Sequence, residues 1–426
     1  MNLFVGIDVG TSGCRAVAID DRGKQRGHAA KTLPAPLRRG NGGVQQDPEI
    51  WWRSVVAVLR QLLATVEARS VRAVAVDGTS ATLLLVDAAG QPVSPALMYN
   101  DARAVDESAR IAAVAPSDTA AQGAGSALAK LLWLQSQPGM SKARYALHQA
   151  DWIAGRLCDR FGFSDCNNSL KLGYDPVNRS WPEWLDRVGV QRRLLPKIVA
   201  PGTPVGCIST VLAERLGLSP TVTVVAGTTD STAAVVATGV SLPGDAVTSL
   251  GSTLVVKVVV EKPLFCSRYG IYSQPLGELW VAGGASNSGG SVLRQFFSDA
   301  QIAEMSGRVN PQRRTCLDYY PLPAPGERFP IADPHLEPRL IPRPRDDLRF
   351  FQGILEGIAR IEQRSYRLLA EMGAPYPSSV RTVGGGAANR AWERIRGRFL
   401  GIPMMQPTHA EAAYGAALLA RGGYTS

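Results

Sequence analysis

One short segment of this 426-residue chain joins a carboxylate to a turn rich in glycine and hydroxyl groups. It reads Asp8-Val-Gly-Thr-Ser-Gly13, and runs of β-type residues lie on both sides of it. A structural turn needs only one or two residues that accept positive φ, whereas this one also offers hydroxyls and unhindered N–H groups. Such a turn can bind a phosphate through Thr11, Ser12 and Gly13, with Arg15 adding a charge-assisted contact. Asp8 can then hold Mg²⁺ through water.

A second segment repeats this design about half a chain later. Residues 248–260, TSLGSTLVVKVVV, again read as a strand, a small turn and a strand. The turn is Gly251-Ser252-Thr253, and we expect it to bind phosphate as well. Two such turns in two similar halves predict a duplicated fold that holds one polyphosphate from both sides.

A third segment, VVAGTTDSTAAVVATG (224–239), places Asp230 between a buried strand and an Ala/Val-rich helix. An aspartate in the first turn of a helix often serves as a cap or interacts with the helix dipole, and that structural role stays open here. Thr228 or Thr229 can supply the cap instead. Asp230 is therefore a candidate general base that takes a proton from a substrate hydroxyl.

A run of three glycines follows a predicted strand in VGGGAANRAWERI (383–395). Bare backbone lets a planar ring lie close, so Gly384, Gly385, Gly386 and Ala387 predict a shelf for adenine, with Asn389 hydrogen-bonding the base. A simple helix-entry turn is the alternative. The segment lacks the spacing of a dinucleotide fingerprint, and the chain contains no G-x-x-x-x-G-K-[ST] loop.

Polar loops in the first half are suited to a sugar-sized ligand. They are VDGTSATLLLVD (76–87), YNDAR (99–103) and DCNNSLKLGYD (165–175). Their short polar groups suit a sugar, and the ring of Tyr99 can lie on a carbon skeleton. Each loop is ordinary alone, but together in one half of the chain they predict a substrate pocket.

Alternating strand and helix patterns make this an α/β protein. The length favours two domains, which we place at residues 1–226 and 227–426, with a cleft between them. The last helix, about 410–422, is a candidate to pack back on the first domain. The apolar stripe of the helix at 349–372 is assigned to the core, and the proline-rich segment 321–344 is predicted to be a surface excursion without helix or strand.

Composition excludes several classes of protein. The chain is 45% hydrophobic and 19% charged, as expected for a soluble protein, and it shows neither a membrane-spanning run nor a signal peptide. Its six scattered cysteines form no C-x-x-C pair, which argues against a zinc site. The net charge of +10 is spread along the chain. We therefore expect a cytoplasmic or organellar monomer or homodimer that binds neither nucleic acid nor membrane.

These motifs, in this order, resemble the FGGY family of carbohydrate kinases, a branch of the actin-like ATPase superfamily. The likeness extends over nearly the whole chain and includes QQDPEIWW (45–52), YYPLPAPGERFP (319–330) and EAAYGAALLA (411–420). It implies two ribonuclease-H-like domains and transfer of phosphate from Mg·ATP to a primary hydroxyl of a sugar or polyol. Asp230 is then the catalytic base and Asp8 the magnesium anchor. The two turns bind the phosphates, and the glycine run binds the nucleoside.

Departures from the family pattern narrow the expected substrate. The run Gly78-Thr-Ser-Ala-Thr82 replaces the Gln-Met-His-Gly of xylulokinases and lacks the Arg-Glu pair of glycerol kinases. The short chain and this loop are similar to small D-ribulose kinases of cyanobacteria and plants, which implies that Asp8, Ser12, Ser80 and Asp230 face D-ribulose. D-xylulose or another polyol, an actin-like ATPase that acts on a protein, and an inactivated sugar-binding regulator remain alternatives. Loss of Asp8 or Asp230, expected in such a regulator, is absent.

Overall fold

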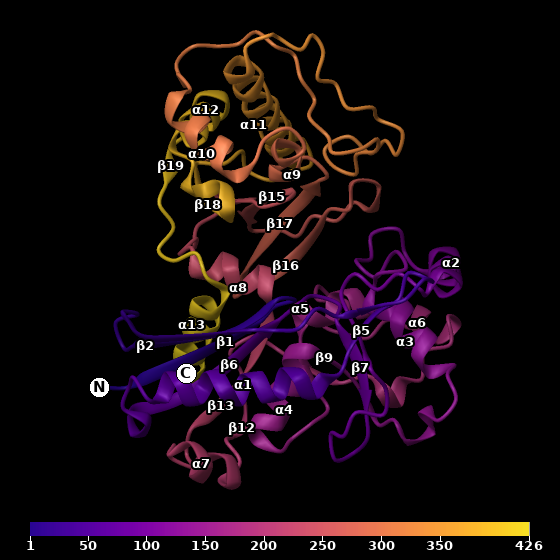
Figure 1. Ribbon diagram of the computed structural model, residues 1–426. Helices are drawn as coiled ribbons and strands as arrows, with labels where there is room; N and C mark the ends of the chain where they lie inside the picture. Colours follow the sequence, from indigo (N-terminus) through magenta and orange to yellow (C-terminus); the bar gives the residue numbers. More distant parts are fainter. Residues whose placement is uncertain (426) are drawn as a thin grey trace. The chain divides into compact units, whose positions relative to one another are not determined.

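The computed structural model describes residues 1–425, which form two compact units (Figure 1). Unit 1 contains Met1–Ala237 and the chain from Glu411 onward, and unit 2 contains Thr238–Ala410. The sequence places the boundary after residue 226, but the break lies after Ala237. The reason is that α8 (Asp230–Ala237) packs on α13 (Ala412–Thr425), which also belongs to unit 1.

Unit 1 is built on a six-stranded sheet in the order β12-β13-β6-β1-β2-β3. The strands are β1 (Leu3–Val9), β2 (Gly13–Asp20), β3 (Gln25–Thr32), β6 (Val71–Gly78), β12 (Pro204–Cys207) and β13 (Thr223–Thr229). β6 runs parallel to both β1 and β13, and the other neighbours are antiparallel. Parallel neighbours end at the same edge of a sheet, so the segments that follow β1, β6 and β13 meet there.

Helices cover both faces of this sheet. Apolar residues of one face pack with α1 (Pro48–Leu63), α4 (Gln149–Cys158) and α7 (Thr210–Leu216). The other face packs with α8 and α13, and Figure 1 shows α13 beside β1 and β6. The approach is close: a Cβ on Gly6 would lie 2.0 Å from the Ala413 carbonyl oxygen. Only glycine allows α13 to lie this near to β1.

Smaller elements extend unit 1 beside α4. A five-stranded sheet has the order β4-β5-β8-β7-β9. Its strands are β4 (Leu37–Arg38), β5 (Val44–Gln46), β7 (Leu83–Val86), β8 (Ala96–Leu97) and β9 (Tyr145–His148). A separate apolar core surrounds α3. The remaining elements are α2 (Val105–Val114), α3 (Ala127–Gln135), α5 (Cys166–Ser169), α6 (Trp184–Arg187), β10 (Phe163–Asp165) and β11 (Lys197–Val199).

Unit 2 repeats the central plan of unit 1 in a six-stranded sheet of order β16-β17-β15-β14-β18-β19. The strands are β14 (Asp245–Leu250), β15 (Leu254–Val260), β16 (Tyr272–Leu276), β17 (Leu279–Ser286), β18 (Ser379–Val383) and β19 (Met404–Met405). β14 pairs antiparallel with β15 and parallel with β18, as β1 does with β2 and β6. This repetition agrees with the duplication predicted from the two turns.

The core of unit 2 forms around α11 (Asp347–Glu371). Its predicted apolar stripe is buried from Phe351 to Leu369, and only Leu368 is partly exposed. A buried ion pair lies next to it, because Arg396 donates two 2.6 Å hydrogen bonds to Glu362. The other helices are α9 (Gly290–Arg294), α10 (Asp299–Arg308) and α12 (Arg390–Leu400).

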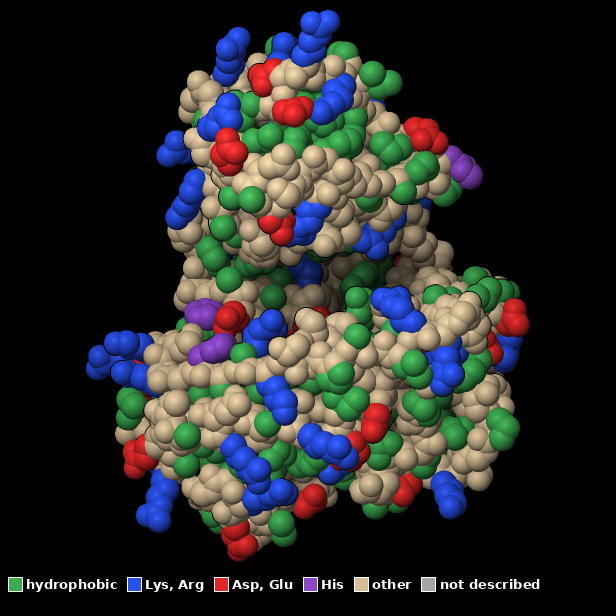
Figure 2. Space-filling model, in the orientation of Figure 1, with side chains coloured by type: hydrophobic (Ala, Val, Ile, Leu, Met, Phe, Trp, Pro, Cys, Tyr) green, Lys and Arg blue, Asp and Glu red, His purple; other side chains and the backbone are tan. Residues whose placement is uncertain are grey.

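The surface agrees with two of the expectations from composition. Figure 2 shows Lys and Arg dispersed over this face, singly or in small groups. Segment 321–344 contains neither helix nor strand, as predicted, apart from isolated bridges such as that between Tyr320 and Arg339. It is not wholly a surface excursion, because Leu322 and Phe329 are buried and Phe329 packs in the core of unit 2. Within residues 1–425, no helix is both long and apolar enough to cross a membrane.

Candidate active site

Three carboxylates gather in unit 1 where β1, β6 and β13 end. Asp8 and Asp77 are direct partners in the β1–β6 register, and Asp77 is the register partner of Thr228 on β13. Asp230 follows β13 at once, as the first residue of α8. Paired residues of parallel neighbours project to the same face, so Asp8 and Asp77 lie together. Asp230 is close enough for its charge to act on Asp77. Asp8 and Asp230 were predicted site residues, whereas Asp77 was given no role.

Burial controls the electrostatics of this carboxylate group. Asp77 is fully buried, and apart from a proton shared with Asp8 its two oxygens have no hydrogen-bond partner among the described residues. Burial raises the pKa of Asp77 well above its usual range, and the charges of Asp8 and Asp230 raise it further. Burial also raises the pKa of Asp8, although Asp77 and Arg15 oppose this shift. A proton shared between Asp8 and Asp77 relieves the repulsion.

Arg15 supplies the positive charge closest to this group. Its Nη1 donates a 3.0 Å hydrogen bond to Asp8 Oδ2, and about 43% of its side chain is exposed. The sequence predicts that Arg15 contacts a phosphate, whereas here it neutralises Asp8. Cys14 directly precedes Arg15 on β2. It stays a thiol, because burial raises its pKa and the charges of Asp8 and Asp77 raise it further.

The junction of β13 and α8 leaves the capping role to a threonine. Thr229 Oγ1 accepts a 3.3 Å hydrogen bond from Thr232 N and lies 2.9 Å from Thr232 Oγ1. Thr228 Oγ1 instead accepts a hydrogen bond from the Asn167 amide. Asp230 Oδ1 accepts a 2.6 Å hydrogen bond from Ser231 N. Thr229 is therefore placed to cap the helix, as the sequence suggested, and the cap does not require Asp230.

Each unit carries one of the two predicted phosphate turns. In unit 1, Gly10 N donates to Gly13 O at 2.9 Å, and Thr11 and Ser12 lie partly or fully at the surface. In unit 2, Gly251 N donates to Thr253 O at 3.1 Å, and the Ser252 side chain is exposed. The two turns therefore close in a similar way. Both present hydroxyl groups that the protein leaves accessible.

One of the predicted sugar loops of unit 1, residues 76–87, contains a short turn after β6. Thr79 N and Oγ1 donate to Gln149 Oε1 at 3.0 and 2.9 Å, and Thr79 Oγ1 lies 2.6 Å from Thr82 Oγ1. Ser80 is partly exposed between them, and Tyr99 is 44% exposed. A sequence motif could not have revealed Gln149, because it lies 70 positions from its partner.

A pocket of about 490 Å³ in unit 2 contains part of the predicted nucleoside site. Its predicted members are Gly251, Ser252, Gly385, Gly386 and Asn389, and its other lining residues include Arg294, Asp299, Ile302, Ala303, Ser306 and Trp392. The predicted residues Thr253, Gly384 and Ala387 do not line it. Residues of α9 and α10 that no motif indicated therefore form much of its wall.

The side chain of Asn389 has a role that differs from the predicted one. Its oxygen accepts a 3.0 Å hydrogen bond from Trp392 N and caps α12. Its nitrogen donates a 2.7 Å hydrogen bond to Ser306 Oγ on α10. Asn389 thus joins α10 to α12. Only its second amide hydrogen is left to donate a hydrogen bond to a base.

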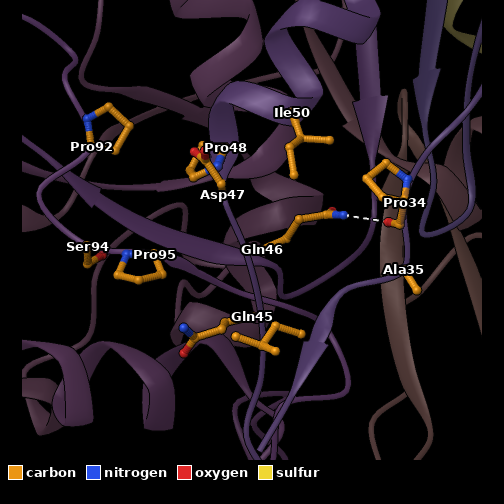
Figure 3. A pocket seen from close by; sticks show the side chains of 11 residues that line it. Pro34, Ala35, Gln45, Gln46, Asp47, Pro48, Ile50, Pro92, Ser94 and Pro95 are labelled. Atoms are coloured by element: carbon orange, nitrogen blue, oxygen red, sulfur yellow. Dashed lines mark hydrogen bonds between the residues drawn. The ribbon is translucent and has the colours of Figure 1, made fainter.

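Unit 1 has a pocket of its own, of about 510 Å³, and none of the predicted site residues line it (Figure 3). Its lining includes Pro34, Pro48, Pro92 and Pro95. The polar groups at its wall are used by the fold: Gln46 donates to the Pro34 carbonyl and accepts from Trp51, and Asp47 caps α1. We assign no chemistry to this pocket.

Comparison with known proteins gives matches over both units. Residues 3–237 match the N-terminal domain of the FGGY family of carbohydrate kinases, and residues 246–422 match its C-terminal domain. A xylulose kinase of Streptomyces coelicolor is 28% identical over 99% of this chain and 88% of its own length. An autoinducer-2 kinase of Yersinia enterocolitica is 27% identical over 99% of this chain and 86% of its own length. The fold is similar to a "xyloylose kinase" from Brucella ovis, with a TM-score of 0.90 at 24% identity over 100% and 91% of the two chains.

Proposed function

Because this chain belongs to the FGGY family of carbohydrate kinases, we propose that it transfers the γ-phosphate of ATP to a primary hydroxyl of a ketopentose. The observation that carries the proposal is the group of carboxylates at the ends of β1, β6 and β13. In this group Asp230 stands one residue beyond the threonine that caps α8. The chain is an ATP-dependent carbohydrate kinase, so the choice of acceptor and the roles of single residues are what the proposal adds.

Asp230 is the proposed general base. As the acceptor oxygen forms its bond to the γ-phosphorus, Asp230 takes the hydroxyl proton, the bond to the β-phosphate oxygen breaks, and ADP leaves. A positioned base contributes about 10²–10⁴-fold to the rate of such a step. Positioning and charge stabilisation supply the rest in phosphoryl transfer. The hydroxyls of Thr11 and Ser12, with the N–H groups of their turn, are suited to hold the transferred phosphate.

Asp8 and Asp77 fit a magnesium ion that arrives with the nucleotide. Apart from the proton shared with Asp8, the two oxygens of Asp77 have no hydrogen-bond partner among the described residues, and its carboxyl group lies beside that of Asp8. No three His, Cys, Asp or Glu side chains form a metal site within residues 1–425. Protein Mg²⁺ sites commonly use one or two carboxylates together with substrate phosphates. When bound, the ion neutralises phosphate charge, and Asp8 would hold it directly or through water.

The unit 2 pocket is the proposed nucleoside site. Gly385 and Gly386 give it a backbone wall, and Trp392 and Ile302 give it apolar surface. A flat base can lie against such a wall, while the exposed Ser252 on the adjoining turn is suited to the β-phosphate. Because Asn389 is used to cap α12, we expect the recognition of the base to depend mainly on shape.

The acceptor is proposed to be D-ribulose, with D-xylulose as the second candidate. The turn Gly78–Thr82 contains no histidine, unlike the corresponding run of xylulokinases, and this favours D-ribulose. The curated relatives named xylulose kinase favour D-xylulose, but at identities of 24–28%. Ser80 and Tyr99 are the side chains proposed to contact the sugar.

A coupled assay of ADP release tests the proposal. Purified protein with Mg·ATP is supplied in turn with D-ribulose, D-xylulose, L-ribulose, glycerol or no acceptor, and mass spectrometry identifies the product. We expect release that depends on a ketopentose, with the highest kcat/KM for D-ribulose. Equal release without any sugar would favour the actin-like ATPase alternative, and a preference for glycerol would contradict the ketopentose proposal.

A further inference from the structure

Lys130 has an unusual position for a lysine. It lies on α3, in the apolar core of that helix, and its side chain is fully buried. Its ammonium nitrogen donates to three backbone carbonyls: Ala81 at 2.8 Å, Tyr99 at 3.1 Å and Gly125 at 2.9 Å. An ammonium group has three donors, and all three are used here. Among the described residues, Lys130 makes no ion pair within 4.0 Å, so its direct partners are these carbonyl oxygens.

Two of these carbonyls belong to the loops proposed to contact the sugar. Ala81 follows Ser80 in the turn after β6, and Tyr99 is itself a proposed contact. Ala81 has φ of 67°, a left-handed conformation that L-residues other than glycine rarely adopt. The surroundings must hold it there. Gln149 holds Thr79 at one end of this turn, and Lys130 holds Ala81 at the other.

The charge on Lys130 makes this arrangement sensitive to pH. Burial lowers the pKa of its ammonium to about 7, while Asp101 opposes this shift and Lys171 adds to it. Below that value the ammonium can bond all three carbonyls. Above it a neutral amine has two hydrogens, and its lone pair faces the third carbonyl, so one of the three bonds is lost.

We propose that Lys130 is a positioning residue for the acceptor pocket, where its ammonium joins the 79–82 turn to Tyr99 and sets the distance between Ser80 and the Tyr99 ring. The inference rests on the proposed function, because it takes these two side chains as sugar contacts. It adds a residue that touches no substrate and acts only through the backbone of others. The affinity for the acceptor then depends on Lys130, whereas the affinity for ATP does not.

The test compares Lys130→Met with Lys142→Met, which removes an exposed lysine of the same unit. KM is measured separately for the ketopentose and for ATP. We expect Lys130→Met to raise the KM of the sugar at least about tenfold and to leave the KM of ATP within about twofold. Lys142→Met should change neither. Equal increases in both values, or none in a folded Lys130→Met protein, would overturn the proposal.

A pH series gives a readout that a purely structural role would not move. For the wild type, the KM of the sugar should rise from pH 6 to pH 8.5 relative to the KM of ATP, and in Lys130→Met this rise should be absent. If the variant does not fold, the wild-type series still decides: a sugar KM that does not change across pH 7 would contradict the proposal.

Hydrogen exchange separates this inference from the proposed function, because it needs no turnover. In Lys130→Met, the amides of residues 79–82 and 98–101 should exchange at least about tenfold faster than in Lys142→Met, with α11 unchanged. Unchanged exchange in these two segments would refute the role of Lys130. Absence of sugar-dependent ADP release by the wild type would instead refute the proposed function and leave the exchange result to stand.

Discussion

The proposed nucleoside site can be tested at two adjacent glycines that line the same pocket. A Cβ on Gly385 would meet no protein atom within 4 Å. A Cβ on Gly386 would lie 2.7 Å from Leu250 Cβ and 2.9 Å from Trp392 Cζ3. Gly385→Ala can therefore act only on what enters the pocket, whereas Gly386→Ala must disturb the protein itself. The two substitutions add the same methyl group and serve as matched controls.

The expected magnitudes follow from these distances. An extra methyl group in a well-packed contact costs about 1–3 kcal/mol. If the base lies on Gly385, its affinity falls by about 5–150-fold, while unfolding changes by no more than about 0.5 kcal/mol. In Gly386→Ala the same cost of about 1–3 kcal/mol should appear as lower stability, because its methyl group meets Leu250 and Trp392.

Calorimetric titration with ADP and thermal unfolding measure the two quantities separately. The account predicts weaker ADP binding and an unchanged Tm for Gly385→Ala, and a lower Tm for Gly386→Ala. If Gly385→Ala binds ADP as tightly as the wild type, the base does not lie against this glycine. The assignment of the pocket would then be refuted, whatever the result for Gly386→Ala.

Two further predictions concern buried charges. Arg396→Met should lower the free energy of unfolding of unit 2 by about 3–5 kcal/mol, because it leaves Glu362 buried without its ion-pair partner. Urea denaturation measures this loss, and a value below about 1 kcal/mol would contradict the reasoning. Burial and the charge of Asp151 raise the pKa of Asp165 to about 7, so between about pH 4 and pH 7 the folded protein holds a proton that the unfolded chain releases. The wild type should therefore lose stability relative to Asp165→Asn as the pH rises through this range, and parallel pH profiles for the two proteins would count against the shift.

The segments with a strong local pattern could be predicted from the sequence. The two turns at Gly10 and Gly251, the cap at Thr229 and the apolar stripe of α11 all depend on residues close in sequence. Local patterns fail where the contact is distant. Asp77 ends a buried strand like many other residues, and its importance follows only from its register with Asp8.

The sequence did not predict several other elements and contacts, because they lack a recognisable apolar pattern. β3 is exposed along most of its length, so it shows no run of buried β-branched residues. α10 has no buried residue, although the capping box of Ser298 and Gln301 was a usable signal. Lys130 looks like an ordinary helix residue, and only the fold shows that three carbonyls surround it. The boundary after Ala237 likewise depends on α13, which comes last in the chain.

The most direct measurement of the central claim is the kcat of Asp230→Asn with the preferred ketopentose. An asparagine oxygen can still accept the hydrogen bond from Ser231 N, and Thr229 still caps α8, so the Tm and the affinity for ADP should not change. The account predicts that kcat falls by about 10²–10⁴-fold. A kcat close to that of the wild type, in a folded variant that binds nucleotide normally, would show that Asp230 is not the base.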